Sequence, residues 1–187
     1  MVKLGYKLMA EEHGPAALVR NTVRAEQAGF AFAAISDHFF PWLDEQGHAP
    51  FAWSVLGAAA QATRQIELMT AVTCPIMRYH PAIVAQSAAT MAVLSENRFI
   101  LGLGAGERLN EHVIGEGWPV SASGTSAFPR PTTSSAGCSK GASRTTVGIT
   151  SCSTTRSCTT APIALLRLSA QPADRRPPAS RGARPTG

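Results

Sequence analysis

An acid and an imidazole, Asp37 and His38, follow a short apolar run over residues 32–35 after one serine. The run contains no Gly or Pro and predicts a buried strand that ends on these two titratable residues. In (β/α)8 barrels the active site lies at the carboxyl ends of the strands, so this position suits a catalytic pair. A histidine titrates near neutral pH and can act there as a general base. The same dipeptide would also serve to close a loop, so it does not decide the function alone.

A second candidate segment is the glycine-rich run over residues 102–106, which follows another apolar stretch. Its glycines stand at 102, 104 and 106, which is not the G-x-G-x-x-G spacing of a dinucleotide fingerprint, and no acidic residue follows about 20 positions later. Glycines leave backbone N–H groups unshielded, so the run suits a close approach to a flat ligand.

The elements that must position these residues alternate along the chain. The pattern predicts strands over 3–9, 32–35, 65–74 and 98–106, and helices from Pro15 to Gly29, over 51–63, from Pro81 to about 95 and over 108–114. Such alternation is typical of an α/β protein with a parallel sheet and right-handed crossovers. The pattern alone allows both a doubly wound sheet and a barrel.

The composition divides the chain into two predicted parts, 1–119 and 120–187. Residues 1–120 hold eight Lys and Arg against eleven Asp and Glu, whereas residues 121–187 hold nine basic residues and one acid. The second part has twelve Ser and eleven Thr, and its one apolar stretch, over 163–166, is too short to form a core. We therefore expect residues 120–187 to be a low-complexity, disordered tail.

Cysteine spacing and hydropathy exclude several classes of site. Cys74 is the one cysteine before residue 120, and Cys138, Cys152 and Cys158 show no CxxC pattern, so neither a metal site nor a disulfide framework is predicted. No signal peptide and no apolar stretch of about 18 residues is apparent, which favours a cytoplasmic protein without a membrane span.

The motifs together resemble one known group, the coenzyme F420-dependent glucose-6-phosphate dehydrogenases of the luciferase-like superfamily. The resemblance runs from residue 2 to about 119. It rests on Ser36-Asp37-His38-Phe39, Pro41-Trp42, Gly47-His48-Ala49-Pro50-Phe51, Thr70, Val72, Pro75, Arg78-Tyr79, Pro81-Ala82, Leu101-Gly102, Gly104, Gly106-Glu107, Leu109-Asn110-Glu111 and Gly117-Trp118-Pro119. It implies the N-terminal half of a (β/α)8 TIM-type barrel, with four βα units.

The resemblance also implies roles for individual residues. His38 and Glu107 would carry out the proton chemistry beside the deazaflavin ring, and Trp42 would help to hold the transition state. The implied cofactor contacts are Asp37, Val72, Cys74, Ala105, Gly106 and Asn110, and no metal is implied. At Cys74 and Ala105 the group often has a hydroxyl, and each missing hydroxyl would cost a hydrogen bond, on the order of 1 kcal/mol.

The implied function is hydride transfer between an alcohol or sugar-phosphate hydroxyl and F420, with a small-molecule substrate and, as in the group, a homodimer. The first alternative is an FMN-dependent monooxygenase of the same superfamily. The second is a non-catalytic remnant with a basic tail, although nucleic-acid binding is disfavoured because the tail has almost no aromatic residues for base stacking.

The predicted strands supply half of a barrel, so the rest of the cofactor pocket has no counterpart in residues 120–187. We expect an open site with weak cofactor binding and turnover, because ligand sites usually bury about 70% or more of a small ligand. The abrupt change of composition leads to the hypothesis that the tail is an out-of-frame translation.

Overall fold

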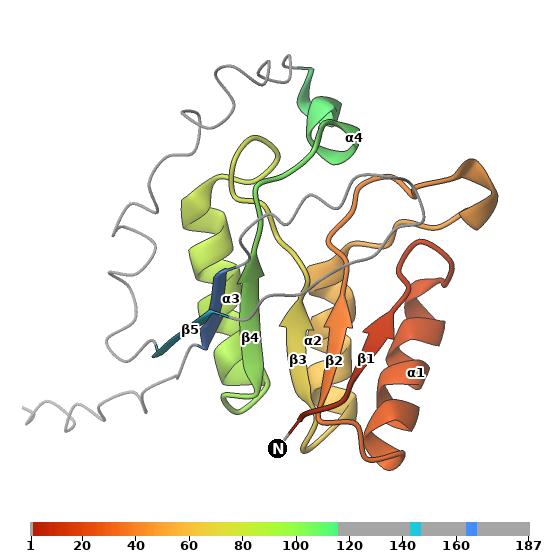
Figure 1. Cartoon of the computed structure of the whole chain (residues 1–187), viewed down its shortest axis with the longest axis vertical. Helices are drawn as coiled ribbons and strands as arrows, with labels where there is room; N and C mark the ends of the chain where they lie inside the picture. The colour runs from red at the N-terminus through yellow and green to blue at the C-terminus, as the bar shows by residue number, and fades with distance from the viewer. Residues whose placement is uncertain (1, 116–142, 147–163, 168–187) are drawn as a thin grey trace, which may run out of the picture.

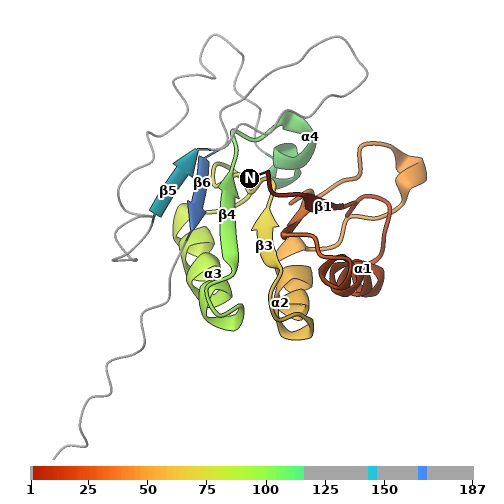
Figure 2. The same cartoon turned by 60° about the horizontal axis from the view of Figure 1, so that its bottom comes forward.

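The protein was analysed as a computed structural model, which describes residues 2–115, 143–146 and 164–167. Its centre is a sheet with the strand order β1-β2-β3-β4-β6-β5 (Figures 1 and 2). The first four strands are parallel: β1 (Gly5–Leu8), β2 (Phe32–Ile35), β3 (Glu67–Thr70) and β4 (Phe99–Leu103). The helices that connect them are α1 (Pro15–Gln27), α2 (Ala52–Ala62) and α3 (Pro81–Leu94). The predicted alternation of strands and helices is confirmed.

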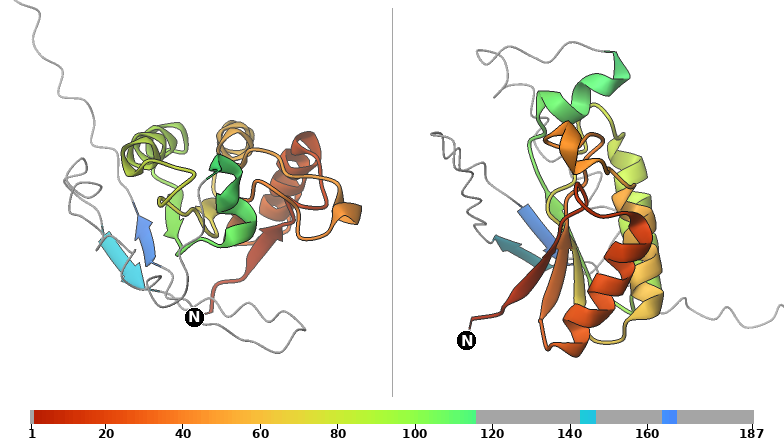
Figure 3. Two further views of the ribbon diagram at one scale, coloured as in Figure 1. Left: turned by 90° about the horizontal axis from the view of Figure 1, so that it is seen from above. Right: turned by 90° about the vertical axis from the view of Figure 1, so that its right-hand side faces the viewer.

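All three connecting helices lie on one face of the sheet, as the views from above and from the side show (Figure 3). A doubly wound sheet would carry helices on both faces, so the arrangement is that of half a barrel. The core forms between the helices and the facing side of the strands, where Leu8, Ile35, Leu68 and Phe99 are buried. This resolves the alternative that the sequence pattern left open.

Local sequence signals define the first helix well. Pro15 starts α1, where its missing N–H costs no hydrogen bond, and Gly29 follows the helix with φ at +83°. The chain then enters β2 within three residues, so the connection between α1 and β2 is short.

The third and fourth strands are shorter than predicted, because their direct pairing ends early. The predicted strand over 65–74 ends at Thr70, and the one over 98–106 ends at Leu103. The Thr70 hydroxyl donates to the Gly102 carbonyl at 3.1 Å and accepts from the Gly102 N–H at 3.0 Å. A side chain therefore replaces backbone pairing at this point, and pairing resumes only at a single parallel bridge between Thr73 and Leu103.

A guanidinium fastens the opposite end of the sheet to α2. Arg98 donates to the carbonyls of Ala60, Thr63 and Ile66 at 2.8 to 3.1 Å, and also to the Thr63 hydroxyl. These carbonyls lie at the end of α2 and just beyond it, where helix carbonyls lack partners within the helix. Arg98 thus ties the start of β4 to the end of α2.

Two short strands from the second part of the chain extend the sheet. β6 (Ala164–Arg167) pairs antiparallel with β4, and β5 (Ser143–Thr146) pairs antiparallel with β6. The sequence analysis did not predict either strand, because their pairing uses the unpaired edge of β4 rather than a core of their own. The disorder expected elsewhere in 120–187 concerns residues outside the described ranges.

Among the helices that the structure describes, none is long and apolar enough to cross a membrane.

Candidate active site

The candidate site lies at the carboxyl ends of the four parallel strands, below α4 (Arg108–Glu111; Figure 1). Parallel strands bring the residues that follow them to one edge of the sheet. Glu11 follows β1, His38 follows β2, Cys74 follows β3 and Glu107 follows β4. The topology therefore brings together groups that are up to 96 residues apart in the sequence.

His38 lies between two carboxylates. Its Nδ1 is 2.7 Å from Glu11 Oε1, and its Nε2 is 3.7 Å from Glu107 Oε1. The Trp42 ring meets the imidazole edge-on, with centroids 5.1 Å apart and an interplanar angle of 83°. The structure thus brings His38, Glu107 and Trp42 into one constellation, as the sequence analysis expected.

Glu11 is the residue that sequence reasoning missed. Its side chain is only 2% exposed. Burial acts to raise the pKa of Glu11, but the contact with His38 and the nearby charge of Lys7 outweigh it and lower the pKa to about 2. An ionised carboxylate beside Nδ1 favours a proton on that nitrogen and leaves Nε2 directed toward Glu107. The available signal was an acid shortly after the first strand, a position to which the sequence analysis gave no role.

A lysine on the inner face of the sheet adds to this charge arrangement. Lys7 pairs in register with Ala34 of β2, and its Nζ donates to the Ser36 hydroxyl. Burial lowers the pKa of Lys7, and the charge of Glu11 opposes that effect. The buried carboxylate of Glu11 therefore has the Lys7 side chain from β1 and the His38 imidazole from the end of β2 close to it.

Asp37 points away from the constellation into a buried polar cluster. Its Oδ2 accepts from Thr73 Oγ1 at 2.7 Å and from Trp53 Nε1 at 3.2 Å. Its Oδ1 accepts from Tyr79 Oη at 3.0 Å and from Arg78 Nη2 at 3.2 Å. Four donors leave this carboxylate little capacity for a further ligand, so its contact with a cofactor stays a prediction. Its observed role is to hold the backbone from which His38 projects.

Arg78 extends the cluster to the end of α4. Its Nη2 donates to the Asp37 carbonyl at 2.6 Å, and its backbone N–H donates to Glu111 Oε2 at 2.7 Å. Its guanidinium carbon lies 4.4 Å from the Tyr79 ring centroid. Burial and the Asp37 charge raise the pKa of Tyr79, so its hydroxyl stays protonated and donates.

Asn110 joins the loops after β2 and β4. Its Oδ1 accepts from the N–H groups of Phe39 and Phe40, at 2.7 and 3.1 Å, and its Nδ2 donates to Glu107 Oε1 at 2.7 Å. The residue is 3% exposed, so the side chain expected to contact the cofactor is mostly engaged within the protein.

The other expected cofactor contacts form a half-exposed strip of small residues. Val72, Cys74, Ala105 and Gly106 are all partly accessible, and Gly106 has φ at +77°. A Cβ at Gly104 would lie 2.2 Å from Val72 Cγ2, so this glycine permits the close packing of the two loops. Burial, with the nearby charge of Glu111, raises the pKa of Cys74 to about 12, so its thiol is neutral. A strip of small, uncharged groups beside His38 and Glu107 fits the face of a planar ring.

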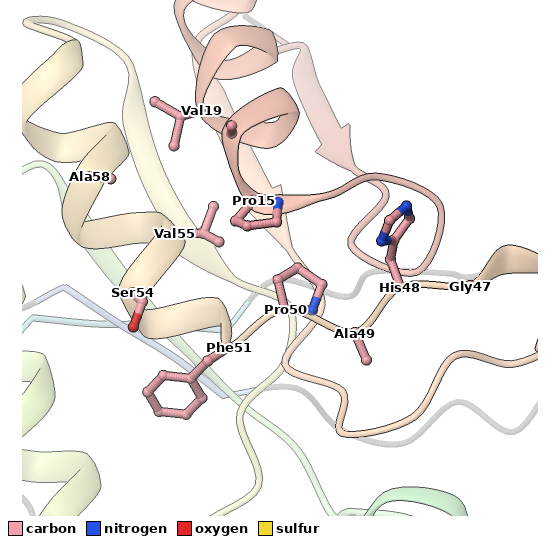
Figure 4. Close-up of a pocket in the computed structure, with 11 residues that line it drawn as sticks. Pro15, Val19, Gly47, His48, Ala49, Pro50, Phe51, Ser54, Val55 and Ala58 are labelled. Atoms are coloured by element: carbon pink, nitrogen blue, oxygen red, sulfur yellow. The ribbon is translucent and has the colours of Figure 1, made fainter.

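A separate hollow of about 590 Å³ lies between the first turns of α1 and α2 and the loop before α2 (Figure 4). Its lining is mainly apolar, with Pro15, Val19, Pro50 and Phe51, and it contains no carboxylate. None of the residues expected at the active site lines it.

Comparison with known proteins identifies a family and several relatives. The luciferase-like monooxygenase family matches residues 2–127. The F420-dependent glucose-6-phosphate dehydrogenase of Intrasporangium calvum is 51% identical over 122 residues, which are 64% of this chain and 36% of that protein. The chain therefore spans about a third of the length of the curated relatives that it matches.

Two solved structures are similar in fold and sequence. An F420-dependent secondary alcohol dehydrogenase in complex with an F420-acetone adduct has a TM-score of 0.63 and 40% identity, over 67% of this chain and 38% of its own. The coenzyme F420-dependent tetrahydromethanopterin reductase of Methanopyrus kandleri has a TM-score of 0.53 and 30% identity, over 63% of this chain and 31% of its own.

Proposed function

The chain belongs to the luciferase-like monooxygenase family, and we propose that its activity is that of an F420-dependent oxidoreductase acting on an alcohol. The single observation that carries this proposal is the line Glu11–His38–Glu107 at the strand ends, in a chain whose relatives are F420-dependent dehydrogenases.

His38 acts as the general base in this proposal. Its Nε2 accepts the hydroxyl proton of the alcohol, while the carbon-bound hydrogen leaves with its electron pair as hydride. Glu11, 2.7 Å from Nδ1, stabilises the imidazolium that forms. Coenzyme F420 would supply the ring that accepts the hydride. The alcohol thus becomes a ketone or aldehyde, and its hydroxyl proton stays on the enzyme.

Glu107 receives that proton from the imidazole. Its Oε1 lies 3.7 Å from Nε2 and its side chain is 38% exposed, so a small movement brings the two groups into contact. Trp42 packs against the edge of the imidazole and restricts its rotation. Val72, Cys74, Ala105 and Gly106 would face the ring of the cofactor.

The substrate is proposed as a class only. The relatives named for their substrates act on glucose 6-phosphate and on a secondary alcohol. Near the described site, Arg78 is occupied by Asp37 and Glu111, and Lys7 donates to Ser36. These cations are engaged within the protein, so the described residues favour recognition of a hydroxyl over recognition of a phosphate.

A fluorescence titration tests the cofactor assignment. Saturable quenching of F420 fluorescence by the 187-residue chain is expected, with weaker affinity than in the Intrasporangium calvum relative, because half of a barrel buries less of the ligand. FMN is titrated in parallel. His48→Ala, which alters the separate hollow, is the matched control for His38→Ala. Tighter binding of FMN than of F420, or no binding of F420 to the 187-residue chain, would contradict the proposal.

A further inference from the structure

The side chain of Asn110 contacts Glu107 and the backbone of the two residues that follow His38. Its Oδ1 accepts from the N–H groups of Phe39 and Phe40, the two residues that follow His38. Its Nδ2 donates to Oε1 of Glu107 at 2.7 Å. That oxygen is the same one that lies 3.7 Å from His38 Nε2.

The orientation of this amide is fixed by its neighbours. Backbone N–H groups require an acceptor, so Oδ1 must face Phe39 and Phe40. A carboxylate requires a donor, so Nδ2 must face Glu107. An amide offers both functions on adjacent atoms, whereas a carboxylate at this position could accept from the two N–H groups but could not donate to Glu107.

Glu107 depends on this contact more than a buried residue would. It is a flexible side chain, 38% exposed, and it precedes the four-residue helix α4. An exposed glutamate without a partner gains rotamer freedom by extending into solvent. Asn110, at 3% exposure, is by contrast held in place by three hydrogen bonds.

We propose that Asn110 is a positioning residue. It holds Glu107 Oε1 near His38 Nε2 by tying Glu107 to the loop after β2, which carries His38. For catalysis this inference rests on the proposed function, in which Glu107 receives the proton from His38. The geometric claim itself needs no cofactor and no turnover. It also differs from the cofactor contact expected for Asn110, because it acts through Glu107.

A double-mutant cycle followed by NMR tests the proposal on the full 187-residue chain without cofactor. The signal is the ¹⁵N chemical shift of His38 Nε2, and the perturbation is Glu107→Gln. In the parent this substitution should move the resonance. In Asn110→Asp the movement should be at least about threefold smaller, because the two sites are no longer coupled. The amide resonances of Phe39 and Phe40 should change less, since an acceptor oxygen remains.

Asn21→Asp on α1 is the matched control, because it makes the same chemical change away from the site and should leave the response to Glu107→Gln intact. An undiminished response in Asn110→Asp would overturn the proposal. If Asn110→Asp does not fold, the unsubstituted chain decides: nuclear Overhauser contacts between the Asn110 side-chain amide and the Glu107 methylenes are expected, and their absence would overturn it. Failure of F420 binding would leave these readouts unchanged, so the two proposals fail separately.

Discussion

Glu11 and His38, from the ends of neighbouring strands, lie 2.7 Å apart, with the carboxylate almost completely buried. The negative charge of a carboxylate beside one ring nitrogen of an imidazole favours the proton on that nitrogen. With Glu11 beside Nδ1, the Nε2 atom of the same imidazole faces Glu107. It also makes the stability of the fold depend on the charge of Glu11.

Glu11→Gln should lower the free energy of unfolding at pH 7 by roughly 3 kcal/mol, since the folded pKa of about 2 lies below the ordinary value of a glutamate. A depressed carboxylate pKa stabilises the fold above the unfolded value, and this stabilisation is lost as the pH falls from about 4.5 to about 2. Urea unfolding of parent and variant across this range measures it. A constant difference between them at all pH values would contradict the assignment.

The catalytic roles are best measured in a chimera that joins residues 1–119 to the remainder of the Intrasporangium calvum relative. His38→Ala should lower kcat by about 10²- to 10⁴-fold, the usual contribution of a general base. Glu107→Gln should also lower kcat, because the imidazolium then has no carboxylate to take its proton. Turnover is followed as the alcohol-dependent loss of F420 absorbance, with His48→Ala as the control. Full turnover in both site variants would refute the roles.

Sequence reasoning worked where the determining residues are neighbours. Pro15 and Gly29 bound α1, and the apolar run that ends at Ile35, before Asp37 and His38, placed β2 at its observed limits. Both signals are local, because a proline fixes one backbone angle and a short apolar run needs only a sheet to cover it.

Other features depend on partners that are distant in the sequence. Asp37 receives its hydrogen bonds from Trp53, Thr73, Arg78 and Tyr79, which arrive only when β3 and the loop after it are in place. Glu11 becomes a site residue only because β1 pairs beside β2. The strand β6 depends on the free edge of β4, so the short apolar stretch over 163–166 did not predict a strand by itself.

Arg98→Met should destabilise the fold by roughly 3 kcal/mol, because carbonyls at the end of α2 would lose their donors in a partly buried position. The Arg64 side chain is exposed, so Arg64→Met is the matched control and should cost less than about 0.5 kcal/mol. Chemical denaturation monitored by circular dichroism measures both. Equal losses in the two variants would show that the end of α2 does not depend on Arg98.

Cys74 should react slowly with iodoacetamide in the folded chain, although it lies in the candidate site. Burial raises the pKa of its thiol to about 12, whereas an unfolded cysteine titrates near 8.5, so at pH 8 the reactive thiolate is roughly a thousandfold rarer in the folded state.

The measurement uses a chain in which Cys138, Cys152 and Cys158 are replaced by serine, and it compares alkylation by mass spectrometry with and without urea. Bound F420 should slow the folded-state reaction further if Cys74 faces the ring, and the Cys74→Ser chain gives the background. Equal alkylation rates in the folded and urea-unfolded chains would mean that the thiol is exposed to solvent in the loop after β3. The strip of small residues that includes Cys74 would then not be the surface against which a planar ring packs.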